Sequence, residues 1–337
     1  MLKNIEELAG TVSSKVDFSG VVLVEKDGKV IYQAASGYSN RADELLNSAG
    51  TKFGIASGSK LFTSIGIAQL VEKGMLAFDT KLKDCLDIVF PHFDENITLH
   101  HLLTHTSGIP DYFDEGTMDD YEDLWKEIPM YKMKRVIDFL PMFQNSKMMF
   151  SPGERFHYNN AGFIVLGMVI EQATGLAFTE YIETNVFARC GMEDSGYYSL
   201  DNLPKDTAYG YIDHEDGSWR SNIYCIAIRG GADGGAFVSA PDMVRFWQSL
   251  LEYKLLTEEF TIKLMTPYVN VKEEEYYGYG IWIRKSDGEI FKYHVLGYDP
   301  GISFHSAFYP QSGLKVAIPS NKSLGAYAIM KAIEGDI

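Results

Sequence analysis

A serine and a lysine stand three residues apart at a point where the sequence becomes helical. Ser57-Gly-Ser-Lys60 precedes a segment whose apolar residues recur at helical spacing, from Leu61 to Val71. Residues three apart on a helix share one face, so the side-chain nitrogen of Lys60 can reach the hydroxyl of Ser57. Serine becomes a nucleophile when a nearby base takes its proton, and a desolvated lysine with a lowered pKa is one such base.

A purely structural interpretation of these residues is equally open. Ser57 would then cap the helix, and Lys60 would be a solvated residue of the first turn. A lysine in the first turn opposes the helix dipole, which counts mildly against this interpretation. A second match, Ser312-Gly-Leu-Lys315, lies in a hairpin turn where the two side chains need not share a face.

A tyrosine followed two residues later by an asparagine offers a general acid or base, and this pattern occurs three times. Only Tyr158-Asn-Asn160 lies in a loop at the mouth of a predicted helix. There Tyr158, as a tyrosinate next to Lys60, could take the Ser57 proton and return it to a leaving group, while Asn160 could bind a substrate carbonyl and hold Lys60. The alternative is an ordinary half-buried tyrosine followed by an asparagine that caps the helix.

The surrounding pattern places strands on both sides of a helical block. Two β-rich runs, at residues 20–28 and 29–37, meet at Asp27-Gly28, which is a strong hairpin signal. The pattern is mostly helical from residue 121 to 191, and strands resume near Thr207. Further helices are expected at both chain ends and after two typical N-cap residues, Thr98 and Ser239.

This order of elements predicts an α+β fold, an antiparallel sheet flanked by N- and C-terminal helices with an inserted helical subdomain. The sheet domain is expected to comprise residues 1–75 and 207–337. The mostly helical subdomain is expected at residues 76–206, and the two parts should form one intertwined unit.

Composition excludes several classes of function. The net charge of −16 disfavours nucleic acids and anionic membrane surfaces as partners. No apolar run reaches the length of a membrane span, and the N-terminus lacks a signal-peptide layout, so a cytoplasmic location is expected if Met1 is the native start. The histidines in HHLLTH lack the glutamate of a metalloprotease motif, so neither a metal nor a cofactor is expected.

Four segments, in their order and spacing, resemble the serine β-lactamase-like superfamily. They are FGIASGSKLFT, ITLHHLLTHTSGIPDY, SPGERFHYNNAGFIVLGMVIEQATG and GGAFVSAPDMVRF. The branch is that of class C β-lactamases, penicillin-binding proteins, D-aminopeptidases and family VIII esterases, and the resemblance extends from about residue 20 to 321. It implies a β-lactamase/transpeptidase-like fold, Ser57 as the acylated nucleophile and Lys60 as its activating partner. It also implies Tyr158 as general base and acid, and Asn160 as a substrate ligand.

The third motif of that superfamily departs from its usual form here. The superfamily has Lys or His, a small residue and then Gly on an inner strand, and the matching segment is YHVLGYDPG. Gly297 fits the motif glycine, Val295 takes the cationic position, and His294 is displaced by one residue. Either a bulge returns His294 to the cleft as a substrate ligand, or the site lacks that cation and holds a β-lactam carboxylate less well. The resemblance also implies the backbone N–H groups of Ser57 and Tyr298 as oxyanion donors.

Together these observations predict a serine hydrolase that acts through an acyl-enzyme on a small-molecule ester, amide or lactam. The altered third motif motivates an alternative, a catalytically weak penicillin-binding or sensor protein of the same fold. The cleft is expected to be shaped by the loop 106–131 and the segment 268–280. The substrate and the oligomeric state stay open.

Overall fold

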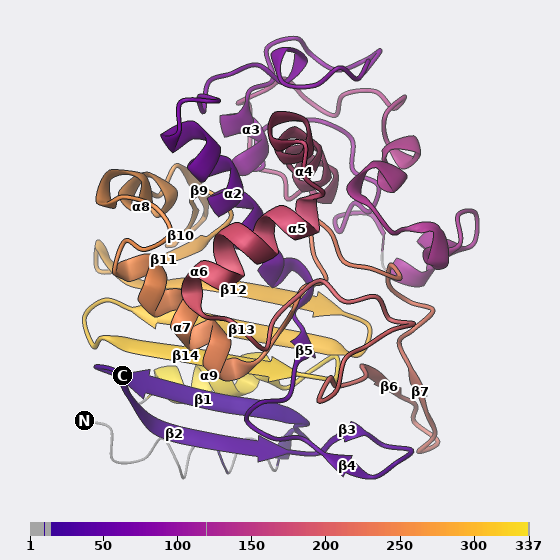
Figure 1. Cartoon of the computed structure of the whole chain (residues 1–337), viewed down its shortest axis with the longest axis vertical. Helices are drawn as coiled ribbons and strands as arrows, with labels where there is room; N and C mark the ends of the chain where they lie inside the picture. Colours follow the sequence, from indigo (N-terminus) through magenta and orange to yellow (C-terminus); the bar gives the residue numbers. More distant parts are fainter. Residues whose placement is uncertain (1–9, 11–14, 119, 336–337) are drawn as a thin grey trace.

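One antiparallel sheet runs through the protein, with its strands in the order β2-β1-β14-β13-β12-β11-β10-β9 (Figure 1). A computed structural model of the chain describes residues 10, 15–118 and 120–335. The strands are β1 (Gly20–Lys26), β2 (Lys29–Ser36), β9 (Val269–Lys272), β10 (Glu275–Tyr277), β11 (Trp282–Ser286), β12 (Glu289–Asp299), β13 (Ile302–Tyr309) and β14 (Leu314–Ser320). The helix expected at the N-terminal end lies almost wholly outside the described residues.

The predicted first hairpin is confirmed. β1 pairs antiparallel with β2, and Asp27 and Gly28 form the turn with φ angles of +49° and +79°. Glycine adopts this left-handed conformation at no steric cost, which explains the Asp-Gly signal. A second hairpin lies where strands were expected to resume after Thr207, and in it β6 (Tyr211–Asp213) pairs with β7 (Trp219–Ser221).

Alternation along β1 divides the apolar side chains between two cores. Val21 and Leu23 belong to the larger core, whereas Val22 and Val24 belong to a smaller one on the opposite face of the sheet. Helix α9 (Ala326–Glu334) covers the smaller core, and α7 (Ala240–Leu251) packs on the other face against β1 and β14. The sheet is therefore covered by helices on both faces. Its strands are antiparallel and its helices do not alternate with them along the chain, which is the α+β class that the sequence predicts.

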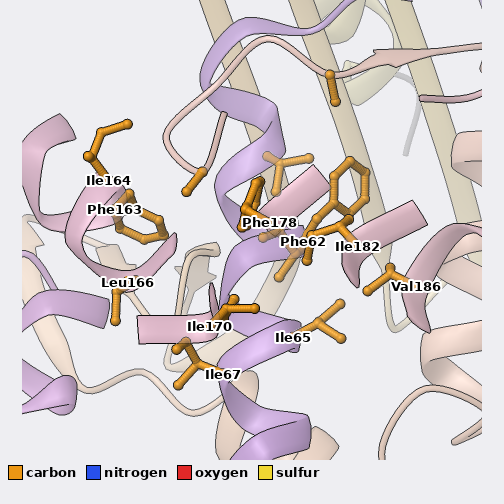
Figure 2. Packing of buried hydrophobic residues seen from close by; sticks show 14 of the residues in the cluster. Phe62, Ile65, Ile67, Phe163, Ile164, Leu166, Ile170, Phe178, Ile182 and Val186 are labelled. Carbon is orange, nitrogen blue, oxygen red and sulfur yellow. The ribbon is translucent and has the colours of Figure 1, made fainter. Parts of the chain in front are cut away.

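The larger core surrounds α2 (Lys60–Glu72), which is buried along nearly its whole length. Figure 2 shows Phe62 and Ile65 of α2 among apolar side chains of the neighbouring helices. A Cβ atom at Gly66 would lie 2.8 Å from Ile170 Cδ1, so the glycine permits close approach of α2 and α4 (Asn160–Thr174). This packing fixes the N-terminal end of α2, where Lys60 lies.

In Figure 1, α3 (Leu99–Leu103) and α4 lie beyond the sheet at the top of the view, whereas α5 (Phe178–Ile182) and α6 (Ala188–Cys190) lie lower, nearer the sheet. Thr98 caps α3 and accepts a hydrogen bond from His101 N. Gly175, with a φ angle of +72°, ends α4. The remaining α-helix and short strands are α8 (Glu258–Leu264), β3 (Tyr38–Asn40), β4 (Leu45–Leu46), β5 (Phe53–Gly54) and β8 (Phe237–Val238).

The α-helical pattern expected from residue 121 is wrong for the first part of that block. Residues 121–142 form three short 3-10 segments, Tyr121–Trp125, Met130–Lys132 and Val136–Met142. Pro129 precedes the second and Pro141 lies inside the third. Proline lacks the N–H group that an α-helix needs, and this prevents the apolar period from continuing as one helix.

The predicted fold class is confirmed for the described residues, whereas the division into two domains stays a prediction. Among the described residues, no single helix has both the length and the apolar composition to cross a membrane. One bent pair, Asn160–Thr174 with Phe178–Cys190, meets the same test only when both arms are counted together. Residues 160–170 of this pair are buried in the larger core.

Candidate active site

Ser57 lies in a 3-10 turn, Ala56–Ser59, between β5 and α2. Ala56 has a φ angle of +44°, an uncommon conformation for a residue with a side chain. Neighbouring segments hold this turn, because Ala56 O accepts a hydrogen bond from Gly235 N (3.1 Å) and from Ser59 Oγ (2.9 Å). Ser57 is therefore presented at a fixed place on the wall of a cavity.

Lys60 is buried at the start of α2, and its side-chain nitrogen has three hydrogen-bond partners. They are Ser57 Oγ at 2.9 Å, Asn160 Oδ1 at 2.7 Å and the backbone oxygen of Asp233 at 2.7 Å. Burial lowers the pKa of Lys60, and the nearby carboxylates, Asp233 foremost, oppose this effect only in part. A buried lysine with a lowered pKa is suited to take a proton from the hydroxyl beside it.

Tyr158 lies in the loop before α4 and lines the same cavity as Ser57. Lys60 Nζ is 4.9 Å from the centre of the Tyr158 ring. Burial raises the pKa of Tyr158 well above its usual value, and a hydrogen bond with Ser57 offsets only part of this rise. The phenol is therefore protonated at neutral pH, and the tyrosinate that the sequence analysis considered is disfavoured.

His105 packs against Tyr158 and forms a hydrogen bond with the backbone of the next residue, Asn159. Its Nδ1 accepts a hydrogen bond from Asn159 N (3.1 Å), so Nε2 carries the proton and donates it to the Tyr277 hydroxyl (3.1 Å). The ring centres of His105 and Tyr158 are 4.4 Å apart. Burial lowers the pKa of His105 well below its usual value, which keeps this tautomer neutral.

The other two histidines of HHLLTH also have structural partners. His100 Nδ1 is 2.9 Å from the Tyr279 hydroxyl, and His101 Nδ1 accepts a hydrogen bond from Thr98 N. Within the described part of the chain, no group of three or more His, Cys, Asp or Glu residues is arranged to hold a metal ion.

The third motif lies on β12, directly beside the Ser57 turn. A Cβ atom at Gly297 would lie 2.1 Å from Ile55 O and 2.9 Å from Ser57 N, so only glycine fits there. Val295 at the cationic position is 2% exposed and belongs to the larger core. The backbone of this strand thus contacts the Ser57 turn, and position 295 of the strand supplies no cation.

His294 does not reach the cavity. It lies opposite Ala307, whose side chain belongs to the α9-covered core, and its Nε2 is 3.5 Å from Glu275 Oε2. Burial lowers the pKa of His294 to about 4, so the ring is neutral at neutral pH. Among the described residues that line the cavity, His294 is absent, and the bulge that would have returned it to the cleft does not occur.

Tyr298 lines the mouth of the cavity and is 44% exposed. Its hydroxyl lies 2.5 Å from His305 Nε2, on the face of the sheet that carries α9. The side chain thus points away from Ser57. Its predicted contribution as an oxyanion donor depends on the backbone N–H alone, and that role stays a prediction.

The cavity has a volume of about 750 Å3 and brings together Ser57, Tyr158, Asn160, Gly297 and Tyr298. Four carboxylates line it, from Glu115, Asp120, Asp233 and Asp299. Burial, with Asp233 nearby, raises the pKa of Asp299 to about 7. Arg229 is the only lysine or arginine among the described lining residues, and its guanidinium is bonded to Tyr197 O and Thr179 Oγ1.

Two parts of this site were missed by the sequence analysis. The loop 106–131 lines the cavity as expected, but the opposite wall comes from residues 226–235 and from Tyr198 and Leu200. No residue of the segment 268–280 is among the described lining residues. The glycine-rich cluster GGADGG, residues 230–235, supplies the Asp233 carbonyl that binds Lys60.

Comparison with known proteins places the chain in a family. The Beta-lactamase family matches residues 8–333. A penicillin binding protein from Bacillus halodurans is 54% identical, with a TM-score of 0.94 over 98% of this chain and 100% of that chain. Penicillin-binding protein 4* from Bacillus subtilis is 29% identical over 98% of this chain and 75% of its own length. An octameric penicillin-binding protein homologue from Pyrococcus abyssi is 28% identical, with a TM-score of 0.84 over 98% and 76% of the two chains. The chain therefore belongs to the Beta-lactamase family, and the predicted resemblance to the serine β-lactamase-like superfamily is confirmed.

Proposed function

We propose that this protein is a serine hydrolase that cleaves a small ester or amide through an acyl-enzyme on Ser57. The observation that carries the proposal is the contact between the buried Lys60 nitrogen and Ser57 Oγ, 2.9 Å apart at the wall of a cavity. A lysine with a lowered pKa next to a serine hydroxyl is the arrangement that nucleophilic catalysis by serine needs.

Acylation begins with proton transfer. Neutral Lys60 takes the Ser57 proton as Oγ forms a bond to the carbonyl carbon, and the carbonyl electron pair moves to oxygen. The backbone N–H of Ser57 and that of Tyr298 are the expected donors to this oxyanion. The intermediate then collapses, the bond to the leaving group breaks, and the leaving group receives a proton.

Tyr158 is suited to deliver that proton. Its raised pKa keeps the hydroxyl protonated, and a hydrogen bond links it to Ser57. The phenol can pass its proton to the leaving group and recover one from the Lys60 ammonium, whose nitrogen lies 4.9 Å from the centre of the Tyr158 ring. In deacylation a water molecule attacks the acyl carbon while neutral Lys60 takes one proton from that water. The bond to Ser57 Oγ then breaks, the acid is released, and the Lys60 ammonium returns a proton to Ser57 Oγ.

The charge of the cavity favours substrates without a carboxylate near the scissile bond. The described lining residues include four carboxylates and one arginine, which is already bonded to Tyr197 and Thr179. Val295 replaces the usual cation of the third motif. A neutral or positively charged ester or amide therefore fits this cavity better than a penicillin carboxylate.

The alternative is a protein that is acylated by penicillin but turns it over slowly. The relative from Bacillus halodurans, a penicillin binding protein with 54% identity, favours this alternative. The two functions share Ser57 as the acylated residue and differ in the rate of deacylation. A cytoplasmic location stays a prediction, which cell fractionation would test.

Hydrolysis of p-nitrophenyl esters, D- and L-amino-acid amides and a fluorescent penicillin would test the proposal. Wild type and Ser57→Ala should be compared by product formation. We expect turnover of a neutral or cationic substrate by wild type only. Stable labelling by penicillin without turnover of any ester or amide would support the alternative, and equal turnover by both proteins would refute Ser57 as the nucleophile.

A further inference from the structure

Two residues adjacent in sequence, Asp111 and Tyr112, each hold one of the carbonyl groups that bind Lys60. Asp111 is bonded to Asn160, and Tyr112 is bonded to Asp233. Asn160 Oδ1 and the Asp233 backbone oxygen are the two carbonyl acceptors of the Lys60 nitrogen, both at 2.7 Å.

Asp111 determines which way the Asn160 amide faces. Its Oδ2 accepts hydrogen bonds from Asn160 N (2.6 Å) and Asn160 Nδ2 (3.3 Å), and its Oδ1 accepts one from Ala161 N (2.9 Å). The Phe113 backbone oxygen accepts a second bond from Nδ2 (3.2 Å). Both protons of the amide therefore face acceptors on this side, so that only Oδ1 can face Lys60.

Tyr112 restrains the other acceptor. Its buried hydroxyl donates a hydrogen bond to Asp233 Oδ2. A bond of 2.8 Å from Gly231 N to Gly234 O closes the turn that contains Asp233. Two hydrogen bonds thus restrain the Asp233 carbonyl that binds Lys60: one to the Asp233 side chain and one that closes the turn around it.

The consequence concerns the direction of proton transfer. A neutral lysine nitrogen has two protons and one lone pair. The two carbonyl oxygens can only accept hydrogen bonds, so they take both protons of the neutral nitrogen. The lone pair then faces Ser57 Oγ, the one partner of the three that has a proton to give.

We propose that Asp111 and Tyr112 are positioning residues for acylation, because together they hold two carbonyl oxygens against Lys60 and leave its lone pair directed at Ser57. This inference rests on the proposed function of Ser57 and Lys60. Neither residue touches the reacting atoms, so each acts through Lys60.

The first test compares Asp111→Asn with Asn159→Ala. Both variants alter a side chain that binds the N-terminus of α4, since Asn159 Oδ1 accepts a hydrogen bond from Gly162 N, but only Asp111 controls the Asn160 amide. With a p-nitrophenyl ester, we expect Asp111→Asn to slow the acylation burst by roughly 10- to 100-fold and to change KM little. This factor is part of the rate enhancement that a general base contributes. Asn159→Ala should acylate at nearly the wild-type rate.

The dependence of kcat/KM on pH distinguishes a positioning role of Asp111 from a merely structural one, because loss of a structural contact alone would not shift it. Burial raises the pKa of Asp111 to about 7, and above this pH its carboxylate raises the pKa of Lys60, so Asp111→Asn should move the acid limb of kcat/KM to lower pH. The groups that face Lys60 and contribute to this limb are Ser57, His105, Asp111, Glu115, Tyr158, Asp233 and Asp299. An unmoved limb, or an equal loss of acylation in Asn159→Ala, would overturn the inference.

A second pair of variants keeps the inference testable if Asp111→Asn does not fold. Tyr112→Phe removes one buried hydroxyl, and Tyr279→Phe removes another that is bonded to His100 and absent from the described cavity lining. We expect acylation to be roughly tenfold slower in Tyr112→Phe, because Asp233 loses a buried hydrogen bond. The acylation rate of Tyr279→Phe should equal that of wild type. Equal rates in the two variants would refute a role for Tyr112. If wild type itself were not acylated on Ser57, the proposed function would fail instead.

Discussion

Gly297 lies so close to Ser57 that a Cβ methyl group added to Gly297 would be 2.9 Å from the Ser57 backbone nitrogen. The same methyl group would lie 2.1 Å from Ile55 O. Strand β12 and the Ser57 turn are thus in backbone contact. A side chain at position 297 would separate them and alter the predicted oxyanion site.

Gly297→Ala should therefore be both less stable and less active. We expect a loss of about 1–3 kcal/mol in the free energy of unfolding, as in other overpacked sites, and a fall in acylation rate of roughly 100-fold or more. Denaturant unfolding and burst kinetics would measure the two effects. Gly50→Ala is the matched control, because a Cβ atom at Gly50 meets nothing within 4 Å.

The pH dependence of kcat/KM should have an acid limb set by Lys60. The rate rises with pH as Lys60 loses its proton, and burial places this pKa below the ordinary value of 10.5. Glu115 raises the pKa of Lys60, so Glu115→Gln should move the limb to lower pH. Glu127→Gln, at an exposed carboxylate, should leave the limb in place. A limb that moved to higher pH in Glu115→Gln would contradict Lys60 as the base.

Lys60→Met should retain the fold but lose the base. General-base assistance contributes roughly 10²- to 10⁴-fold, so acylation should fall by about that factor. The apolar stem of methionine fills most of the lysine site, and unfolding experiments should therefore show a folded protein. Acylation at the wild-type rate in Lys60→Met would show that another group activates Ser57.

Carboxylates in the cavity should select against anionic substrates. At pH 8, where Asp299 is ionised, we expect Asp299→Asn and Glu115→Gln to raise kcat/KM for a carboxylate-bearing ester by roughly 3- to 10-fold, as expected for the loss of one like charge at short range. The neutral ester of the same length should change much less. Equal effects on both esters would exclude charge as the basis of selection.

Asp299 should also make stability depend on pH. Its pKa is raised from the ordinary value of 3.8 to about 7, so the folded protein holds a proton that the unfolded chain has lost between these values. The free energy of unfolding must then fall as pH rises through this interval. Asp299→Asn removes this dependence and should stabilise the protein at pH 8 by about 1–2 kcal/mol. This is less than the full pKa shift of Asp299 implies, because the cavity is open to solvent. Urea unfolding at two pH values would detect the difference, and an equal effect at pH 4 and pH 8 would contradict it.

Periodicity and turn chemistry predicted the parts of this fold that local sequence controls. The Asp27-Gly28 hairpin, the Thr98 cap and the helix that follows Ser57 are all present. Local propensity failed at residues 121–142, where two prolines prevent an α-helix. The strands β9 and β10 were also not predicted, because these short runs depend on neighbours in the sheet: β10 pairs with β11, and β9 pairs with β10.

Long-range contacts explain what was missed in the site. The Asp233 carbonyl is a backbone group 173 residues from Lys60, and no side-chain motif marks it. Asp111 and Tyr112 belong to a segment that carried the family resemblance, but their type alone did not indicate that they hold Asn160 and Asp233. His294 shows the reverse case, in which a suggestive residue type lies on the opposite face of its strand.

The most direct test of the central claim is the site of acylation. Wild type and Ser57→Ala would be mixed with a neutral p-nitrophenyl ester, quenched in acid within the burst phase, digested and analysed by peptide mass. The account predicts one acyl group on the peptide that contains Ser57 in wild type and none in Ser57→Ala. An acyl group on another residue, or an equal amount of labelling in both proteins, would contradict it.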